Sequence, residues 1–318
     1  MTRRTFACLL ILGSLGACGA GAAPSTSVSR TGPTDDVSVF SYDPKAPLGL
    51  QVVSSEKQEG ITIQTITYVS PKGGRVPAAL IIPEGKGPFA GMVLMHGAPG
   101  EYQQMLPDGK VLARCGAVVL MIDAPFARLG QEQNPFTFGD RDRENQIQLI
   151  IDLRRGVDLL LARPDVDPKR LGYLGISYGG AMGGLFAGVE KRLKAYVMVV
   201  GDGGLVSHFT GPDDTHGYLR QLPAERVRRW RSSMEPIEPI RWVGRAAPAH
   251  LLFQNGRRDE FVPPSDAKAY QEAGSEPKKI LWYDAGHGLN HDAVRDRHEW
   301  LAGELGIRKP ETAWETAP

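Results

Sequence analysis

The sequence predicts an α/β fold, with a doubly wound, mostly parallel sheet of eight strands and a small helical cap inserted late in the chain. Short apolar runs alternate with helical patterns along the chain, as βαβ units require. Most of these runs are apolar throughout, which is typical of parallel strands that are covered on both faces. A long interruption between two late runs, at about residues 202–246, leaves room for the cap.

Eight runs are expected to form the strands of this sheet. The first run alternates apolar and polar residues and suits a strand with one exposed face, whereas most of the others are continuously apolar. The predicted strands are residues 61–69, 76–82, 91–96, 117–123, 171–175, 195–201, 250–254 and 279–284.

Helical patterns separate the later runs. Residues 145–163 carry apolar side chains that cluster on one helical face, and residues 180–188 form a helix of small residues. Shorter helices are expected at 267–273 and 291–305. The cap combines helical residues 205–210, a polar turn at 211–217 and a basic helical stretch at 218–234. Its arginines are expected to form a solvated face, the alternative being a patch for an anionic substrate: Arg226, Arg228, Arg229 and Arg231.

The composition is that of an ordinary globular chain. It has 318 residues, of which 42% are hydrophobic and 23% charged, enough to bury a large core. The formal net charge of +1 argues against a protein that coats nucleic acid, so no nucleic-acid partner is expected. No apolar run reaches the roughly 20 residues that a membrane span needs. The three cysteines, Cys8, Cys18 and Cys115, provide neither a disulfide framework nor a metal-binding spacing.

The first residues are typical of an export signal. Arg3 and Arg4 precede an apolar stretch at residues 6–17 that is too short to span a bilayer, so residues 1–17 are predicted to be a signal peptide. Residues 2–6 also resemble a twin-arginine signal. We therefore expect a protein that is exported in a bacterium.

A lipid anchor is expected at Cys18. Residues 15–18 resemble a bacterial lipobox, in which a lipid is attached to the cysteine thiol, and an anchored chain would have a membrane surface as its partner. Gly19 in the next position favours an outer-membrane lipoprotein; a periplasmic protein with an ordinary signal, in which Cys18 is incidental, is the alternative. Residues 18–48 are predicted to be a flexible tether, followed by the folded domain at 49–308 and a tail at 309–318.

Ser177 is the candidate nucleophile. It lies in a Gly-x-Ser-x-Gly motif, Gly175 to Gly179, which follows a predicted strand and opens a predicted helix. The tight turn requires the glycines, because bulky side chains would not fit two positions to either side of the serine. The turn lifts the hydroxyl above the carboxyl edge of the sheet, where the helix N-terminus favours negative charge.

His287 and Asp259 are the candidate base and acid. A serine hydroxyl is a weak nucleophile until an imidazole activates it, and His287 follows the last strand in a loop flanked by glycines, with His291 as its rival. Asp259 follows the penultimate strand, where it would orient the imidazole and stabilise its cation. The alternative acids are Glu260, Asp284 and Asp202.

An oxyanion hole needs backbone N–H donors near the serine. The amide of Tyr178, directly after Ser177, is one candidate. The loop after the third strand supplies the other, for which Ala98 is preferred over Gly97, because Pro99 has no N–H. His96 is expected to brace this loop.

The ordered set of His96-Gly97, Gly175-x-Ser177-x-Gly179, Asp259 and Gly286-His287 resembles the α/β-hydrolase fold superfamily over about residues 50–306. The run Gly-x-Ser-Tyr-Gly-Gly at 175–180 is similar to the prolyl oligopeptidase and dienelactone hydrolase side of it, which includes acetyl esterases. The resemblance implies a Ser-His-Asp hydrolase without a cofactor. The sequence departs from these families at two points. Dienelactone hydrolases proper carry a cysteine at the position of Ser177, and the chain has no room for the N-terminal propeller of oligopeptidases.

We therefore expect a serine hydrolase that cleaves small-molecule carboxylic esters through an acyl-enzyme. An exopeptidase or amidase with the same triad is the alternative, and a non-catalytic binding lipoprotein is a third hypothesis. No metal site is expected, because Asp213, Asp214 and His216 fit a polar loop. The loop at 123–139 and the cap are expected to shape the pocket, and the oligomeric state is left open. The candidate lining residues, which would otherwise be simple packing, are Phe126, Phe136, Phe138, Tyr178, His208 and Phe209.

Overall fold

The computed structural model describes residues 36–131, 133–210 and 218–311. The predicted signal peptide, Cys18, most of the predicted tether, the polar turn at 211–217 and the end of the tail lie outside these ranges. Within the described part of the chain, no helix is both long and apolar enough to cross a membrane.

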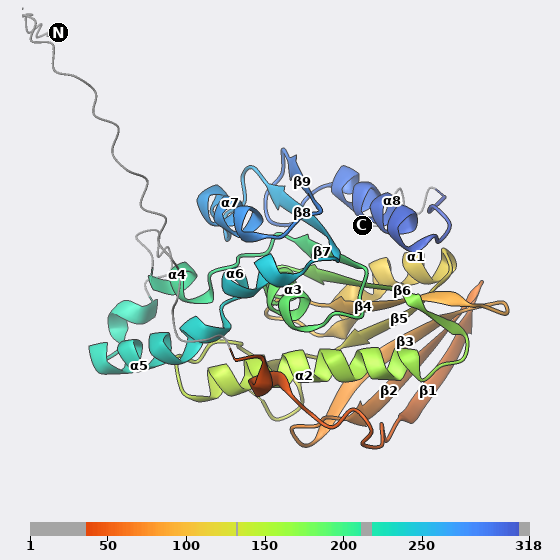
Figure 1. Ribbon diagram of the computed structural model, residues 1–318, viewed down its shortest axis with the longest axis horizontal. Coiled ribbons are helices and arrows are strands. Elements are labelled where there is room, and N and C mark those ends of the chain that lie inside the picture. Colours follow the sequence, from red (N-terminus) through yellow and green to blue (C-terminus); the bar gives the residue numbers. More distant parts are fainter. Residues whose placement is uncertain (1–35, 132, 211–217, 312–318) are drawn as a thin grey trace, which may run out of the picture. The chain divides into compact units, whose positions relative to one another are not determined.

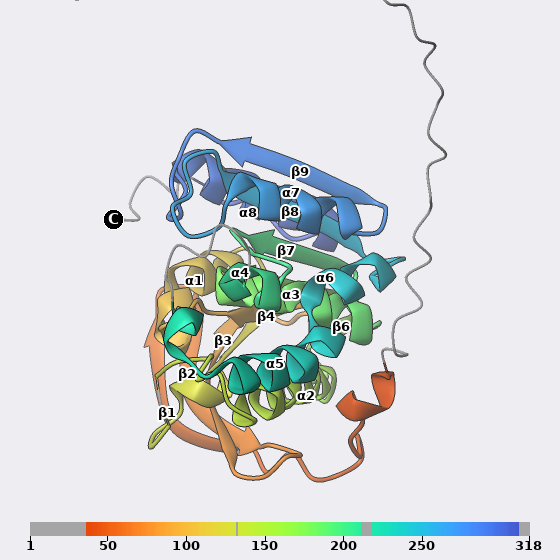
Figure 2. The same ribbon diagram turned by 90° about the vertical axis from the view of Figure 1, so that its left-hand side faces the viewer.

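The described strands form a single nine-stranded sheet (Figure 1). Its order is β1-β2-β3-β5-β4-β6-β7-β8-β9, and both views show it rising from β1 to β9 (Figures 1 and 2). The pairs among β1, β2, β3 and β5 are antiparallel, and all pairs from β5 to β9 are parallel. The strands are β1 (Gln51–Gln58), β2 (Ile61–Val69), β3 (Arg75–Pro83), β4 (Phe89–Met95), β5 (Ala117–Ile122), β6 (Val166–Ile176), β7 (Ala195–Val199), β8 (His250–Gly256) and β9 (Lys278–Tyr283).

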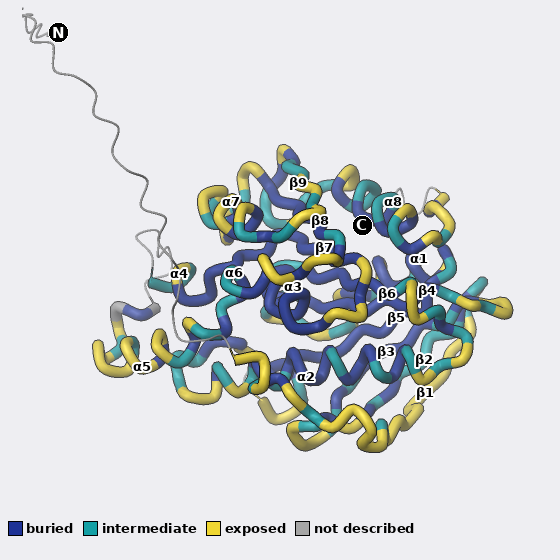
Figure 3. Tube along the Cα trace, in the orientation of Figure 1, coloured by how far each residue is buried: buried dark blue, intermediate teal, exposed yellow. Residues whose placement is uncertain are grey.

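Helices cover both faces of the sheet and bury two separate clusters of apolar side chains. The helices α1 (Leu106–Arg114) and α8 (His291–Leu305) pack on one face. On the other face lie α2 (Arg141–Leu161), α3 (Tyr178–Val189) and α7 (Pro264–Ala273). The central strands are buried along their length, as their continuous apolar runs predict (Figure 3). The doubly wound, mostly parallel architecture is therefore confirmed.

A helical insertion lies between β7 and β8, as predicted. It contains α4 (Leu205–Thr210), α5 (Ala224–Met234) and α6 (Pro239–Trp242). Short 3₁₀ turns complete the described elements: η1 (Val37–Phe40), η2 (Tyr102–Met105), η3 (Pro125–Ala127), η4 (Tyr218–Gln221), η5 (Glu235–Ile237) and η6 (Val243–Arg245).

The predicted number of eight strands is wrong by one, because β1 was not expected. Residues 51–57 of this strand are all exposed, so its sequence carries no alternation of buried and exposed side chains. It forms the antiparallel edge of the sheet beside β2, and Figure 3 shows it as an exposed segment. The eight predicted strands correspond to β2–β9.

The predicted tether is also wrong over residues 36–48, which are packed on the folded domain. Phe40 is fully buried, and its ring meets the ring of Trp242 edge to face at 5.4 Å. Two arginines of α2 hold the backbone of the segment: Arg154 donates to the Phe40 carbonyl at 2.8 Å, and Arg155 donates to the Pro44 carbonyl at 3.0 Å. Composition alone suggested a tether, but the buried Phe40 ring and the hydrogen bonds from α2 hold the segment on the domain.

This packing predicts that Phe40 contributes to stability as a core residue does. We expect Phe40→Ala to lower the free energy of unfolding by about 3–5 kcal/mol, measured by urea denaturation, because it leaves a cavity beside Trp242. Val37→Ala in the same turn is the control, since Val37 is 47% exposed and should change the free energy by less than about 0.5 kcal/mol. Equal effects of the two substitutions would contradict the packing.

Candidate active site

The residues predicted to carry chemistry meet at one edge of the sheet. Ala98 follows β4, Ser177 follows β6, Asp259 follows β8 and His287 follows β9. These four strands are parallel, so their carboxyl ends lie at the same edge, where α/β sheets commonly bind ligands. The structure thus brings together side chains that are up to 189 residues apart in the chain (98 to 287).

Ser177 occupies a strained turn between β6 and α3. Its backbone has φ +54° and ψ −113°, a conformation that costs on the order of 1–3 kcal/mol in a residue with a side chain. The neighbouring glycines permit this turn. A Cβ on Gly175 would lie 2.2 Å from the Gly179 carbonyl oxygen, and a Cβ on Gly179 would lie 2.4 Å from the Met95 carbonyl oxygen. The turn therefore has the geometry that the Gly-x-Ser-x-Gly motif predicts.

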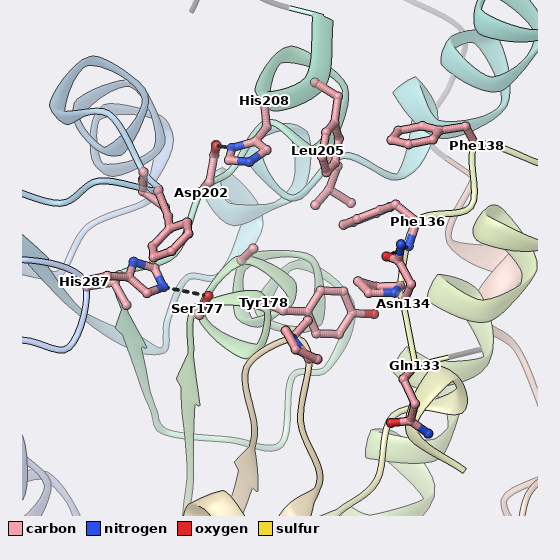
Figure 4. A pocket seen from close by; sticks show the side chains of 18 residues that line it. Gln133, Asn134, Phe136, Phe138, Ser177, Tyr178, Asp202, Leu205, His208 and His287 are labelled. Atoms are coloured by element: carbon pink, nitrogen blue, oxygen red, sulfur yellow. Dashed lines mark hydrogen bonds and ion pairs between the residues drawn. The ribbon is translucent and has the colours of Figure 1, made fainter. Parts of the chain in front are cut away.

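A chain of hydrogen bonds joins Ser177, His287 and Asp259, and Figure 4 shows the link between Ser177 and His287. His287 Nε2 lies 2.9 Å from Ser177 Oγ, and its Nδ1 lies 2.9 Å from both carboxylate oxygens of Asp259. Asp259 is acceptor-only when ionised, so Nδ1 carries the proton and Nε2 is left to accept from the serine hydroxyl.

The Asp259 carboxylate is held in place by its own loop. Its side chain is 1% exposed, and its Oδ1 accepts hydrogen bonds from the amides of Phe261 and Val262, each at 2.9 Å. Burial by itself raises the pKa of Asp259, but the hydrogen bonds from His287 and the two amides outweigh it and lower the pKa. The carboxylate therefore stays ionised beside the imidazole at neutral pH.

The rival candidates do not reach the Ser177–His287 pair. The Glu260 carboxylate accepts from the backbone amide of His287 at 3.2 Å and does not contact its ring. Asp284 is an exposed member of a surface ion pair, and His291 begins α8 at an exposed position. Asp202 is paired with a different histidine, His208, through Nδ1 at 2.8 Å.

The loop after β4 is braced by His96, as predicted. Its fully buried ring bonds the Gly97 carbonyl through Nδ1 at 2.6 Å and accepts from the Ala124 amide through Nε2 at 3.1 Å. Burial lowers the pKa of His96 to about 4, so the ring is neutral at neutral pH. The Gly179 amide donates to the His96 carbonyl at 3.1 Å and ties this loop to the turn of Ser177. Both predicted oxyanion donors, Ala98 and Tyr178, consequently lie beside Ser177 in the lining of one pocket.

The pocket at Ser177 has a volume of about 560 Å³ and is lined mainly by apolar side chains. Five of the six predicted lining residues face it: Phe136, Phe138, Tyr178, His208 and Phe209. Phe126 is the exception and a wrong prediction. It is 2% exposed and packs edge to face against Tyr178 and His96, at 5.2 and 5.7 Å, as part of the core.

Several lining residues were not predicted, because they carry no motif. Asn134 comes from the loop before α2, Leu205 from α4, Ala181 from α3 and Phe261 from the loop that holds Asp259. The sequence placed these residues only near strand ends or in the cap. Such a position identifies the region of the pocket but not the side chains that line it.

Asp142 fixes the wall of this pocket and was also not predicted. Its fully buried carboxylate accepts from the Thr137 amide and hydroxyl, from the Phe138 amide at 2.8 Å and from Trp230 Nε1 at 2.8 Å. It therefore joins the pocket loop to α5 of the cap.

From the exposed face of α5, Arg226 donates to the Thr137 and Phe138 carbonyls at 2.8 Å, whereas Arg228 and Arg229 form surface ion pairs. Arg228 and Arg229 thus lie on a solvated face, whereas Arg226 holds the pocket loop.

Among the residues that the structure describes, no group of three His, Cys, Asp or Glu side chains is placed to hold a metal ion. The polar triplet Asp213, Asp214 and His216 lies outside the described residues.

Comparison with known proteins gives one family and several distant relatives. A model of the prolyl oligopeptidase family matches residues 110–306. Acyl-coenzyme A thioesterase 3 of Mus musculus is 27% identical over 250 residues, which cover 70% of this chain and 53% of the thioesterase. The uncharacterized peptidase YuxL of Bacillus subtilis (strain 168) is 27% identical over 244 residues, which cover 71% of this chain and 36% of YuxL. The chain thus spans about half or less of these relatives.

Solved structures show the same fold. The acetyl xylan esterase from Paenibacillus sp. R4 superposes with a TM-score of 0.67 and 21% identity, covering 81% of this chain and 90% of the esterase. Acetyl xylan esterase 1 from Thermoanaerobacterium sp. JW/SL YS485 superposes with a TM-score of 0.68 and 18% identity. The match covers 83% of this chain and 90% of that esterase. These matches confirm the predicted resemblance to α/β-hydrolases, and at such identities they carry the fold alone.

The buried, neutral His96 predicts a loss of stability in mild acid. The pKa of His96 is about 4 in the fold and 6.5 in an unconstrained histidine, so between these values the unfolded chain binds a proton that the fold does not. The stabilisation of the fold by neutral His96 is complete above about pH 6.5 and is lost as the pH falls towards 4. We expect His96→Asn, which does not titrate, to reduce the slope of unfolding free energy against pH in this window by up to about 1.4 kcal/mol per pH unit. Urea unfolding from pH 4.5 to 7.5 measures it, and parallel slopes would contradict this assignment.

Proposed function

The chain belongs to the prolyl oligopeptidase family of serine hydrolases, and from the geometry at Ser177 we propose that it cleaves carboxylic esters through an acyl-enzyme intermediate. The observation that carries this proposal is the continuous hydrogen-bonded chain from Ser177 Oγ through the His287 ring to the Asp259 carboxylate. Three such groups in series are the arrangement that activates a serine hydroxyl.

The first step forms the acyl-enzyme. Ser177 Oγ attacks the ester carbonyl carbon while its proton moves to His287 Nε2, and the Asp259 carboxylate stabilises the imidazolium. The carbonyl oxygen becomes an oxyanion that accepts hydrogen bonds from the Ala98 and Tyr178 amides, each worth roughly 2.7–4 kcal/mol in the transition state. The oxyanion then re-forms the carbonyl, the bond to the leaving oxygen breaks, and that oxygen takes the proton from His287.

The second step releases the acid. Water enters where the alcohol departed and gives a proton to His287 Nε2 as its oxygen attacks the acyl carbon. The tetrahedral intermediate collapses, the bond to Ser177 Oγ breaks, and the proton on His287 restores the serine hydroxyl. The N-terminus of α3 at Ser177 favours the negative charge that develops in both steps.

The lining of the pocket argues against an exopeptidase. An exopeptidase would need carboxylates placed to bind the terminal amine of its substrate. Asp202 is the single carboxylate among the described residues that line the pocket, and its Oδ2 is paired with His208. Its Oδ1 accepts from the Gly204 amide at 2.8 Å, so the carboxylate is engaged within the fold.

Substitution of the nucleophile and of the acid tests the mechanism. With p-nitrophenyl butyrate, we expect Ser177→Ala to lower kcat by about six orders of magnitude, to background, and Asp259→Asn to lower it by about 10⁴-fold. Ser265→Ala is the matched control, because Ser265 is an exposed serine outside the pocket and should retain full activity.

A second substrate separates the alternatives. Turnover of alanyl p-nitroanilide above that of the butyrate ester would make the protein a peptidase or amidase. A folded protein that hydrolyses neither compound and whose Ser177 resists a fluorophosphonate would favour the non-catalytic binding hypothesis.

We further propose that the protein is exported and anchored to a membrane through a lipid on Cys18, which rests on the signal in residues 1–18. Expressed with its full leader in a Gram-negative host, the wild type should label with radioactive palmitate and sediment with membranes. Cys18→Ser should abolish both, while Cys8→Ser, inside the apolar stretch, should change neither. Label retained in the Cys18→Ser protein would overturn the anchor.

A further inference from the structure

The pocket has two sides with respect to Ser177, and this inference rests on the ester hydrolysis proposed above. His287 must reach the leaving oxygen to protonate it, so the alcohol part of an ester lies on the side of His287. Phe261 stands on this side, with its ring 5.0 Å from the imidazole. The acyl part must then extend the other way, towards Tyr178 and Phe136, which Figure 4 shows across Ser177 from His287.

Aromatic rings form the wall on the acyl side. Phe136 meets Tyr178 edge to face at 6.2 Å and Phe209 at 5.1 Å, and Phe209 meets Phe138 at 5.2 Å. Trp230 lies behind them, 5.1 Å from Phe138 and 6.5 Å from Phe136. Each contact has the edge-to-face geometry that aromatic pairs prefer.

Buried polar groups hold part of this wall in place. The Asp142 carboxylate holds the Phe138 amide and Trp230 Nε1 together, as described above. Gln146, also fully buried, accepts from the Tyr178 hydroxyl and donates to the Pro135 carbonyl at 3.2 Å. These contacts position Phe138, Tyr178 and Trp230, against which the rings of Phe136 and Phe209 pack.

The volume of the pocket exceeds what a small acyl group needs. About 560 Å³ is within the range of sites that enclose drug-sized ligands. An acetyl group on Ser177 would leave the aromatic wall in contact with water, whereas an acyl group that carries a ring would cover it and displace that water. We propose that the preferred substrates are esters of aryl-bearing acids, with the ring of the acyl group seated against Phe136 and Phe209.

A series of esters with one leaving group tests this inference in the wild type. The compounds are p-nitrophenyl acetate, hexanoate and 3-phenylpropanoate, compared by kcat/KM. We expect the phenylpropanoate to exceed the acetate by at least about tenfold and to exceed the hexanoate as well, because fit to an apolar pocket discriminates by such factors. Preference for the acetate would overturn the inference, and preference for the hexanoate would overturn its aromatic part.

Two matched substitutions then locate the acyl side. Phe136→Leu and Phe261→Leu each remove one ring from the same pocket, on opposite sides of Ser177. We expect Phe136→Leu to lower the ratio of phenylpropanoate to acetate kcat/KM by about fivefold, and Phe261→Leu to leave it within twofold. The ratio is insensitive to partial loss of folded enzyme. A larger fall of the ratio with Phe261→Leu would place the acyl group on the other side and overturn the assignment.

Labelling with a fluorophosphonate distinguishes failure of this inference from failure of the proposed function. If Ser177 is labelled and all three esters are cleaved with the acetate preferred, ester hydrolysis stands and the aryl preference falls. If Ser177 is not labelled and no ester is cleaved, the proposed function fails, and the aryl preference fails with it.

Discussion

The close approach of three backbone segments at Ser177 is the constraint on which the site depends. The β6–α3 turn contacts the end of β4 through the glycines, and the Ser177 amide donates to the Val199 carbonyl of β7 at 2.8 Å. A Cβ at Gly180 would lie 2.5 Å from that same carbonyl oxygen. With side chains excluded from these contacts, α3 packs against the sheet edge with its N-terminus at the nucleophile. Once this turn is fixed, short loops after β4, β8 and β9 are enough to place Ala98, Asp259 and His287 beside Ser177.

Two histidines at the same edge show how surroundings assign different tasks to one residue type. The ring of His96 is fully buried, which disfavours its charged form despite the bond to the Gly97 carbonyl, so the ring acts as a neutral brace. His287 is partly exposed in the pocket and faces an ionised carboxylate, which in the proposed reaction would stabilise the imidazolium.

The strands and the three residues at Ser177 were predictable because each depends on a local pattern. Continuous apolar runs identified β3–β8, and the order of serine, aspartate and histidine after particular strands selected Ser177, Asp259 and His287. The choice between Asp259 and its neighbour Glu260 rested on loop position, and the structure shows why they differ: one carboxylate faces the ring of His287 and the other its amide. The strand β1 and the packing of Phe40 could not be predicted, since an exposed edge and a single buried ring leave no periodic pattern.

The wall of the acyl side illustrates a different limit. Its rings come from the loop before α2, from α4 and from α5, and what aligns them is the buried carboxylate of Asp142, whose partners lie 5 residues away at Thr137 and 88 residues away at Trp230. No sequence motif records such a contact, because it exists only once the cap has packed on the loop. The chemistry is set by strand ends that the fold positions in the same way in many hydrolases, whereas selectivity is set by segments that are free to differ. Membership in the prolyl oligopeptidase family therefore constrains the reaction class far more than the acyl group. For the acyl group, the arrangement of Phe136, Phe138 and Phe209 is the stronger argument.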